Sequence, residues 1–348
     1  MGILYLKHGQ QQTGKAAVRH RHAQNCYLMA SRHLEHEEWE EARHLLARAL
    51  ELHDGHLPTL RALANLEFTL GNLPQAHEYL DRLLEQRAPE DSETLFLLGN
   101  IELSDGNIAA ALKAYTRADE LGDPSPELTF NIGLSHLLLG HGQQAAEVFT
   151  RLVEEQPANG RSWDALGCAL RLEKQYQEAM HAFLQALQAD PDLNDSRDHM
   201  AQMLLEMANP RQARQVLETA LAIEPDRASS RHLLGLAYAT LQDYPRAIAC
   251  WEELIASDGA LPETYHLLAN AYMQNQDRPH AVKALQRLLE INPFHLSGQL
   301  QLALLLFEEG KVERGWVHLE KARTIDPQNL TVIQLLNAAE TMHPRRDG

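Results

Sequence analysis

A glycine-containing motif near the start of the chain has the spacing of a phosphate-binding loop. Gly9, Gly14 and Lys15 match the pattern G-x-x-x-x-G-K, in which backbone amides and a lysine surround a phosphate. Ala16 stands where a serine or threonine would ligate Mg²⁺, and such a loop also needs a strand before it. We therefore interpret residues 9–16 as a polar lead-in, and a nucleotide-binding enzyme is the least favoured of the functions considered.

Histidine is the second residue type that could do chemistry. The chain has 19 histidines, and seven of them fall between residues 20 and 56. Three close pairs could each offer two imidazoles to one metal ion: His20 with His22, His33 with His36, and His53 with His56. Zinc sites usually take a third and a fourth ligand from a rigid frame, and no signature such as HExxH appears. We expect solvated histidines, with no metal and no other cofactor.

The three cysteines, Cys26, Cys168 and Cys250, lie far apart and form no CxxC motif. This usage fits free thiols in a reducing compartment better than disulfides. Cys168 and His199 could form a nucleophile pair, but no residue pattern activates the thiol. No run approaches 18 apolar residues, so we expect no membrane span and a cytoplasmic protein. We predict that the chain is not an enzyme.

The charge of the chain disfavours nucleic acid as a partner. The net charge is −17, from 31 basic and 48 acidic residues. Residues 1–34 hold five bases and no acid, so the remainder carries 26 − 48 = −22. An acidic body repels phosphate backbones, and we therefore expect no nucleic acid as a partner.

Small residues recur along the chain with a period of 34 residues, broken by one step of 35. One series occupies Ala42, Ala76, Ala111, Ala145, Ala179, Ala213, Ala247, Ala281 and Gly315. A second occupies Ala30, Ala64, Gly99, Gly133, Gly167, Ala201, Gly235, Ala269 and Ala303. A small residue at fixed spacing marks a close crossing of two helices. Prolines recur on the same period at Pro157, Pro191, Pro225, Pro293 and Pro327, where each would stop a helix.

The clearest single unit is residues 160–193, which carries Trp163, Leu166-Gly167, Ala179, Phe183 and Pro191. With this pattern the chain resembles the tetratricopeptide repeat family. Nine units fit, beginning near residues 23, 57, 92, 126, 160, 194, 228, 262 and 296. The resemblance implies an all-α, right-handed solenoid of helix-turn-helix repeats over residues 23–327. We expect residues 1–22 to be a flexible basic segment and residues 328–348 a capping helix with a short tail, its end-covering face formed by Leu330, Ile333 and Leu336.

The resemblance also implies a concave groove lined by the first helix of each repeat, through its second, fifth, ninth and twelfth positions. Carried over to this sequence, it gives nine candidate partner-binding residues: Tyr27, Arg61, Asn65, Phe96, Asn100, Phe130, Asn131, Asp164 and Asp198. The aromatic residues and amides suit an extended peptide or a helix with apolar anchors. Alternatively, several of these aromatic rings simply pack between adjacent first helices.

Two known binding modes of the family fit poorly. A carboxylate clamp needs a basic residue and an asparagine in one repeat and supporting basic residues two repeats later. Arg61 and Asn65 match its first half, but Phe130 and Leu134 occupy the second. An asparagine ladder needs Asn at the sixth position throughout, and only Asn131 provides it. We expect a non-catalytic scaffold or adaptor that binds a partner peptide or helix in the groove. The alternative is an accessory subunit of an enzyme system, such as envelope glycan synthesis or protein secretion.

Overall fold

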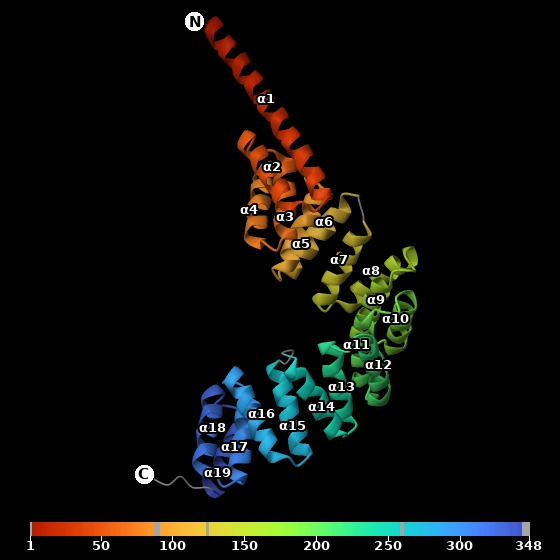
Figure 1. Ribbon diagram of the computed structural model, residues 1–348, viewed down its shortest axis with the longest axis vertical. Helices are drawn as coiled ribbons and strands as arrows, with labels where there is room; N and C mark the ends of the chain where they lie inside the picture. The colour runs from red at the N-terminus through yellow and green to blue at the C-terminus, as the bar shows by residue number, and fades with distance from the viewer. Residues whose placement is uncertain (1, 87–90, 123–124, 258–260, 343–348) are drawn as a thin grey trace. The chain divides into compact units, whose positions relative to one another are not determined.

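The computed structural model describes residues 2–86, 91–122, 125–257 and 261–342, with side chains from residue 17 onward. Over these ranges the chain forms helices and turns and no strand, which confirms the predicted all-α class (Figure 1). In chain order the helices are α1 (Gly2–Glu35), α2 (Trp39–Leu52), α3 (Leu57–Thr69), α4 (Leu73–Glu85), α5 (Ser92–Ser104), α6 (Ile108–Glu120), α7 (Pro126–Leu138), α8 (Gly142–Glu155), α9 (Gly160–Leu172), α10 (Tyr176–Ala189), α11 (Asn194–Glu206), α12 (Pro210–Ile223), α13 (Ala228–Thr240), α14 (Tyr244–Ala256), α15 (Pro262–Gln274), α16 (Arg278–Ile291), α17 (Leu296–Glu308), α18 (Val312–Ile325) and α19 (Leu330–Met342).

The helices pack as a solenoid in two compact units, and within each unit every helix contacts the next helix in the chain. The first unit, Met1–Gln175, contains α1 to α9, and the first helices of neighbouring repeats also touch, as α3 does with α5. The second unit, Tyr176–Gly348, contains α10 to α19, with α19 packed on α18. Because each repeat contacts only its neighbours, few contacts oppose such a division.

In the repeats whose two helices lie in one unit, the small residue of the first helix faces a large residue 16 positions later on the second helix. Where the small residue is glycine, its partner in the sequence is aromatic, as in Gly99 with Tyr115. Where it is alanine, the partner is leucine, as in Ala64 with Leu80. A Cβ atom added to Gly235 would lie only 2.5 Å from Nε1 of Trp251. The two side chains of each pair therefore fill a similar total volume, because the larger aromatic ring occupies the space that a glycine leaves free.

The turn between the two helices of each repeat contains one residue in the left-handed region. After α3, Gly71 has φ +77°, the amide of Asn72 donates to the carbonyl of Glu67 (2.8 Å), and that of Gly71 donates to Phe68 (3.0 Å). This is the Schellman arrangement, which pairs the free carbonyls at the helix end. All nine repeats have a left-handed residue in this turn, at Glu37, Gly71, Gly106, Gly140, Lys174, Ala208, Gln242, Gln276 and Gly310.

The recurring prolines contribute a carbonyl as well as a helix stop. The side chain at the fourth position of a repeat donates a hydrogen bond to the proline carbonyl six residues earlier. Trp163 donates to Pro157 (2.9 Å), Arg197 to Pro191 (2.7 Å) and Gln299 to Pro293 (2.8 Å). Tryptophan, arginine and glutamine all carry a side-chain N–H, so the fourth position supplies a donor in each of these repeats although the residue type differs.

At both ends of the chain the structure differs from the prediction made from the sequence. Residues 2–22 form the first part of α1, which runs unbroken to Glu35, so no structural boundary falls at residue 22. The segment contains no proline, and extending an existing helix is cheap compared with nucleating one.

The capping helix α19 lies where predicted, but a different face is buried. Val332 and Ala339 are buried against repeat nine, whereas Leu330 and Ile333 are exposed. Leu335 and Leu336 pack beside the buried pair, which completes the i, i+3, i+4, i+7 stripe of an amphipathic helix. The tail at 343–348 lies outside the described residues.

Candidate partner-binding groove

Phe96 on α5 and Phe130 on α7 occupy the same position in consecutive repeats, and each is supported by an aromatic ring from its own repeat. The ring centroids of Phe96 and Tyr115 are 5.8 Å apart. Those of Phe130 and Phe149 are 5.4 Å apart, in an edge-to-face arrangement. Tyr115 and Phe149 are fully buried, whereas the two phenylalanines are only partly buried. A rigid aromatic floor therefore fixes two partly exposed rings.

The amides expected beside these rings form a hydrogen-bond network between repeats three and four. The Oδ1 atom of Asn100 accepts hydrogen bonds from the hydroxyl of Tyr115 (2.7 Å) and from Nδ2 of Asn131 (3.0 Å). Burial raises the pKa of Tyr115 to about 12, so its hydroxyl remains a donor at neutral pH. The structure thus joins Asn100 to Asn131, which the sequence suggested only as separate ligands.

Arg61 on α3 already has two acidic partners. Its guanidinium lies 3.0 Å from Asp91 and 2.7 Å from Glu93, at the start of the next repeat. Asp91 also caps α5 by accepting the backbone N–H of Thr94 (2.9 Å). Burial would raise the pKa of Asp91, but the Thr94 hydrogen bonds and the charge of Arg61 lower it below its usual value. Asn65, one turn further along α3, is exposed and available for contacts.

Tyr27 and Asp164 lie at opposite ends of the first unit. Tyr27, on α1, is partly buried with its ring centroid 6.0 Å from that of His56. Asp164 is partly buried on α9. On the same helix, the guanidinium of Arg161 lies 5.6 Å from the ring centroid of Phe130, which is within cation–π range. The sequence did not single out Arg161, although it holds the groove-lining second position of its repeat.

Asp198, in the second unit, is a structural residue rather than an open acidic ligand. Its side chain is buried and accepts hydrogen bonds from Arg227 (2.8 Å), Ser229 (2.6 Å) and Ser230 (2.5 Å). Arg227 also binds Asp195 and Glu224. Burial would lower the pKa of Arg227, but its hydrogen bonds to Asp198 and Asp195 raise it above the ordinary value. The charge of the candidate residue Asp198 is therefore neutralised by Arg227, which the sequence did not single out.

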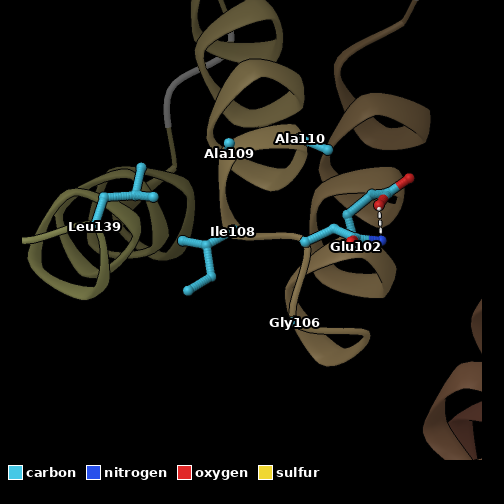
Figure 2. A pocket seen from close by; sticks show the side chains of 7 residues that line it. Glu102, Gly106, Ile108, Ala109, Ala110 and Leu139 are labelled. Carbon is cyan, nitrogen blue, oxygen red and sulfur yellow. Dashed lines mark hydrogen bonds between the residues drawn. The ribbon is translucent and has the colours of Figure 1, made fainter. Parts of the chain in front are cut away.

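The surface pocket in Figure 2 lies away from the candidate residues. It has a volume of about 530 Å³ beside the turn between α5 and α6. Glu102, Gly106, Asn107, Ile108, Ala109, Ala110 and Leu139 line it. Inside it, Asn107 donates a hydrogen bond to Glu102 (2.9 Å), so its two most polar side chains satisfy each other. None of the nine candidate groove residues borders this pocket.

The remaining chemical candidates also have a structural setting. Residues 9–16 lie inside α1, where the backbone is helical, rather than in the loop that a phosphate site requires. His20, His53 and His56 gather with ring centroids 5.1 to 6.0 Å apart. All three cysteines are free thiols. Over the described residues, no helix combines the length and the apolar character needed to cross a membrane.

Comparisons with known proteins agree with the repeat pattern. A model of the cytochrome c-type biogenesis protein H TPR domain matches residues 148–263, and two tetratricopeptide repeat models match residues 61–126 and 262–295. No curated protein matches the chain.

Several solved structures have a similar fold. The C-terminal part of a TPR repeat-containing protein from Cytophaga hutchinsonii has a TM-score of 0.55 and 15% identity, covering 69% of this chain and 98% of that one. A tetratricopeptide repeat protein from Parabacteroides merdae has a TM-score of 0.51 and 14% identity, covering 71% and 97%. The human IFIT1 dimer with PPP-AAAA has a TM-score of 0.52 and 20% identity, covering 90% and 79%. At these identities the likeness concerns the fold alone. With its repeat register, helix pairs and three matching family models, this chain is a tetratricopeptide repeat protein.

Proposed function

We propose that the chain is a non-catalytic scaffold that binds an apolar segment of a partner protein across α5 and α7. The observation that carries this proposal is the pair Phe96 and Phe130, two partly exposed rings at equivalent positions, each held by a buried aromatic ring. Anchors fixed before binding lose little side-chain entropy when a partner docks. Aromatic residues are also enriched among the residues that dominate binding energy.

The polar residues around these rings favour an apolar partner over an acidic one. Arg61 is paired with Asp91 and Glu93, so a partner carboxylate would have to displace existing ion pairs. Asn100 and Asn131 are hydrogen-bonded to each other. We therefore assign affinity mainly to the phenylalanines, with Asn65 and Arg161 as peripheral contacts. An amphipathic helix or an extended peptide with two apolar side chains suits this surface. The free thiols agree with the cytoplasm as the expected compartment.

Site-specific crosslinking tests the location of the partner. A photoreactive phenylalanine analogue is placed at position 96 or 130 and, as a control, at position 294, where Phe294 is 77% exposed in the second unit. In the native host, positions 96 and 130 should crosslink to the same protein, and position 294 should not. The F96A/F130A variant should bind that protein at least about tenfold more weakly, while F294A binds normally. Equal crosslinking from all three positions would contradict the proposal.

A second candidate is an accessory subunit of an enzyme system. The observation that favours it is the match of residues 148–263 to the TPR domain of cytochrome c-type biogenesis protein H. The two candidates differ in the captured partner. If that partner is an enzyme, its turnover is measured with and without this chain. If this chain changes the turnover and the F96A/F130A variant does not, the accessory role is supported. If the turnover is the same with and without this chain, the scaffold role is supported.

A further inference from the structure

Two imidazoles and one carboxylate converge in the second unit, outside the proposed binding surface. Glu263 and His266 lie in the first turns of α15, and His295 directly precedes α17. The ring centroids of the two histidines are 4.8 Å apart, and one ligand atom from each of the three residues lies within 4.8 Å of the others. The side chains of His266 and His295 are only 16% and 19% exposed, whereas Glu263 is 60% exposed.

The spacing of these atoms is too long for good hydrogen bonds and close to that of metal ligands. Nδ1 of His266 lies 3.4 Å from one carboxylate oxygen of Glu263, and Nε2 of His295 lies 3.8 Å from the other. Charge-assisted hydrogen bonds are usually about 2.7–2.9 Å long. Around tetrahedral Zn²⁺, bonds of about 2.0–2.1 Å place neighbouring ligand atoms roughly 3.3 Å apart. A small inward movement would complete such a set.

Other contacts of the two rings favour this arrangement. Nε2 of His266 is buried and has no hydrogen-bond partner among the described residues, so this ring has only its weak contact to Glu263. Nδ1 of His295 accepts the backbone N–H of Gly298 (3.0 Å), which fixes the ring with Nε2 toward Glu263.

We infer that Glu263, His266 and His295 form a Zn²⁺ site. One carboxylate oxygen and two imidazole nitrogens are a ligand set that Zn²⁺ accepts, and three protein ligands leave a fourth position open. The exposed side of Glu263 places that position toward solvent, where water or a donor atom of a bound molecule could fill it. The site does not depend on the proposed function of the first unit.

Zinc binding requires the ring proton of each histidine to move to its other nitrogen. Since Nδ1 of His295 accepts a hydrogen bond, the neutral ring carries its proton on Nε2, and Zn²⁺ must displace that proton. A neutral ring keeps one proton, so this proton moves to Nδ1 and breaks the hydrogen bond from Gly298. At His266 the metal takes Nδ1, and the ring proton moves to Nε2. Zinc binding should therefore perturb the amide of Gly298.

Zinc binding is measured on the full chain at pH 7.5 by competition with a chromogenic chelator. The variants are E263Q, H266Q and H295S; serine is itself a good N-cap, so H295S removes the imidazole while keeping a cap for α17. The control is H280Q, which removes an exposed histidine paired with Asp277 at 2.8 Å in the same unit. Wild type and H280Q should bind one more Zn²⁺ than the three variants, or bind it at least about tenfold more tightly.

A second readout places the metal at this site rather than at another histidine. In protein labelled with ¹⁵N-glycine, one equivalent of Zn²⁺ should shift the amide signal of Gly298 in wild type and H280Q but not in E263Q. If the five proteins bind Zn²⁺ with equal number and affinity, or if the Gly298 signal does not respond in wild type, the inference is overturned. Should H295S fail to fold, E263Q still decides the question, because Glu263 is exposed and outside the core.

Discussion

Gly133 and Phe149 form a matched pair across the two helices of repeat four: a Cβ atom on Gly133 would lie 2.7 Å from Cζ of Phe149. Real Cβ contacts essentially never reach that distance. The phenylalanine is fully buried and in turn supports Phe130 of the candidate surface. One glycine therefore connects the packing of the repeat to the position of a proposed binding residue.

The pairing predicts a compensating double substitution. G133A alone forces a methyl group into the Phe149 ring and should destabilise the chain by about 1–3 kcal/mol. F149L alone leaves a cavity and should also destabilise it. The double variant G133A/F149L recreates the Ala–Leu pair of other repeats, so its loss should be at least about 1 kcal/mol smaller than the sum of the single losses. Urea unfolding of the four proteins measures this coupling, and simple additivity would contradict the pairing.

The left-handed turn residues predict opposite effects of exchanging glycine and alanine. Ala208 has φ +54°, where a Cβ atom is unfavourable, so A208G should stabilise the protein by about 0.5–1 kcal/mol. Gly140 has φ +76° and open space around its Cα, so G140A should destabilise the protein by a similar amount through backbone strain alone. Thermal unfolding of both variants checks the prediction. Shifts of the same sign would show that the turn geometry is not the cause.

The repeat register could be predicted from sequence because it depends on residue size at fixed intervals. The alanines expected at close helix crossings, from Ala42 to Ala281, are completely buried. Their role follows from local geometry that every repeat shares, so nine copies of the same signal reinforce one another. The family pattern also placed Phe96 and Phe130 correctly on first helices.

The polar pairings of the groove could not be predicted in the same way. Arg61 meets Asp91, and Asp198 meets Arg227, across about 30 residues of sequence. Asp91 and Arg227 are the N-cap residues of α5 and α13, the first helices of the following repeats. Each pair occurs once, so no periodic pattern indicates it. The face of α19 was also misjudged, because exposed Leu330 and Ile333 are as apolar as the buried Val332. Composition alone does not say which side meets repeat nine.

The buried Asp198 predicts a large difference between two neighbouring acidic residues. D198A removes the acceptor of Arg227, Ser229 and Ser230 and leaves a partly buried guanidinium with fewer partners. Breaking such a buried pair typically costs about 3 kcal/mol or more. Asp195 also binds Arg227, but its side chain is 65% exposed, so D195A should cost less than about 1 kcal/mol. Urea unfolding compares the two variants, and equal losses would show that burial does not set the strength of this network.

His56 predicts how the stability of the first unit changes with pH. Burial lowers the pKa of His56, and the neighbouring His20 and His53 lower it further, because a second positive charge is unfavourable there. The unfolded chain, with a histidine pKa near 6.5, therefore binds a proton more readily than the folded chain. The contribution of the neutral His56 to the free energy of unfolding is present above about pH 6.5 and is lost as the pH falls below that value.

The H56Q variant isolates this contribution, because glutamine does not titrate. Glutamine can also still form hydrogen bonds to Thr59 and Gln24, which His56 contacts at 2.7 and 2.9 Å. The difference in thermal midpoint, wild type minus H56Q, should become steadily smaller between pH 7.5 and pH 5.5. Groups that lie away from His56 contribute equally in both proteins and cancel in the difference. A difference that grows as the pH falls would mean that the folded state favours the protonated ring, and the buried neutral His56 would be disproved.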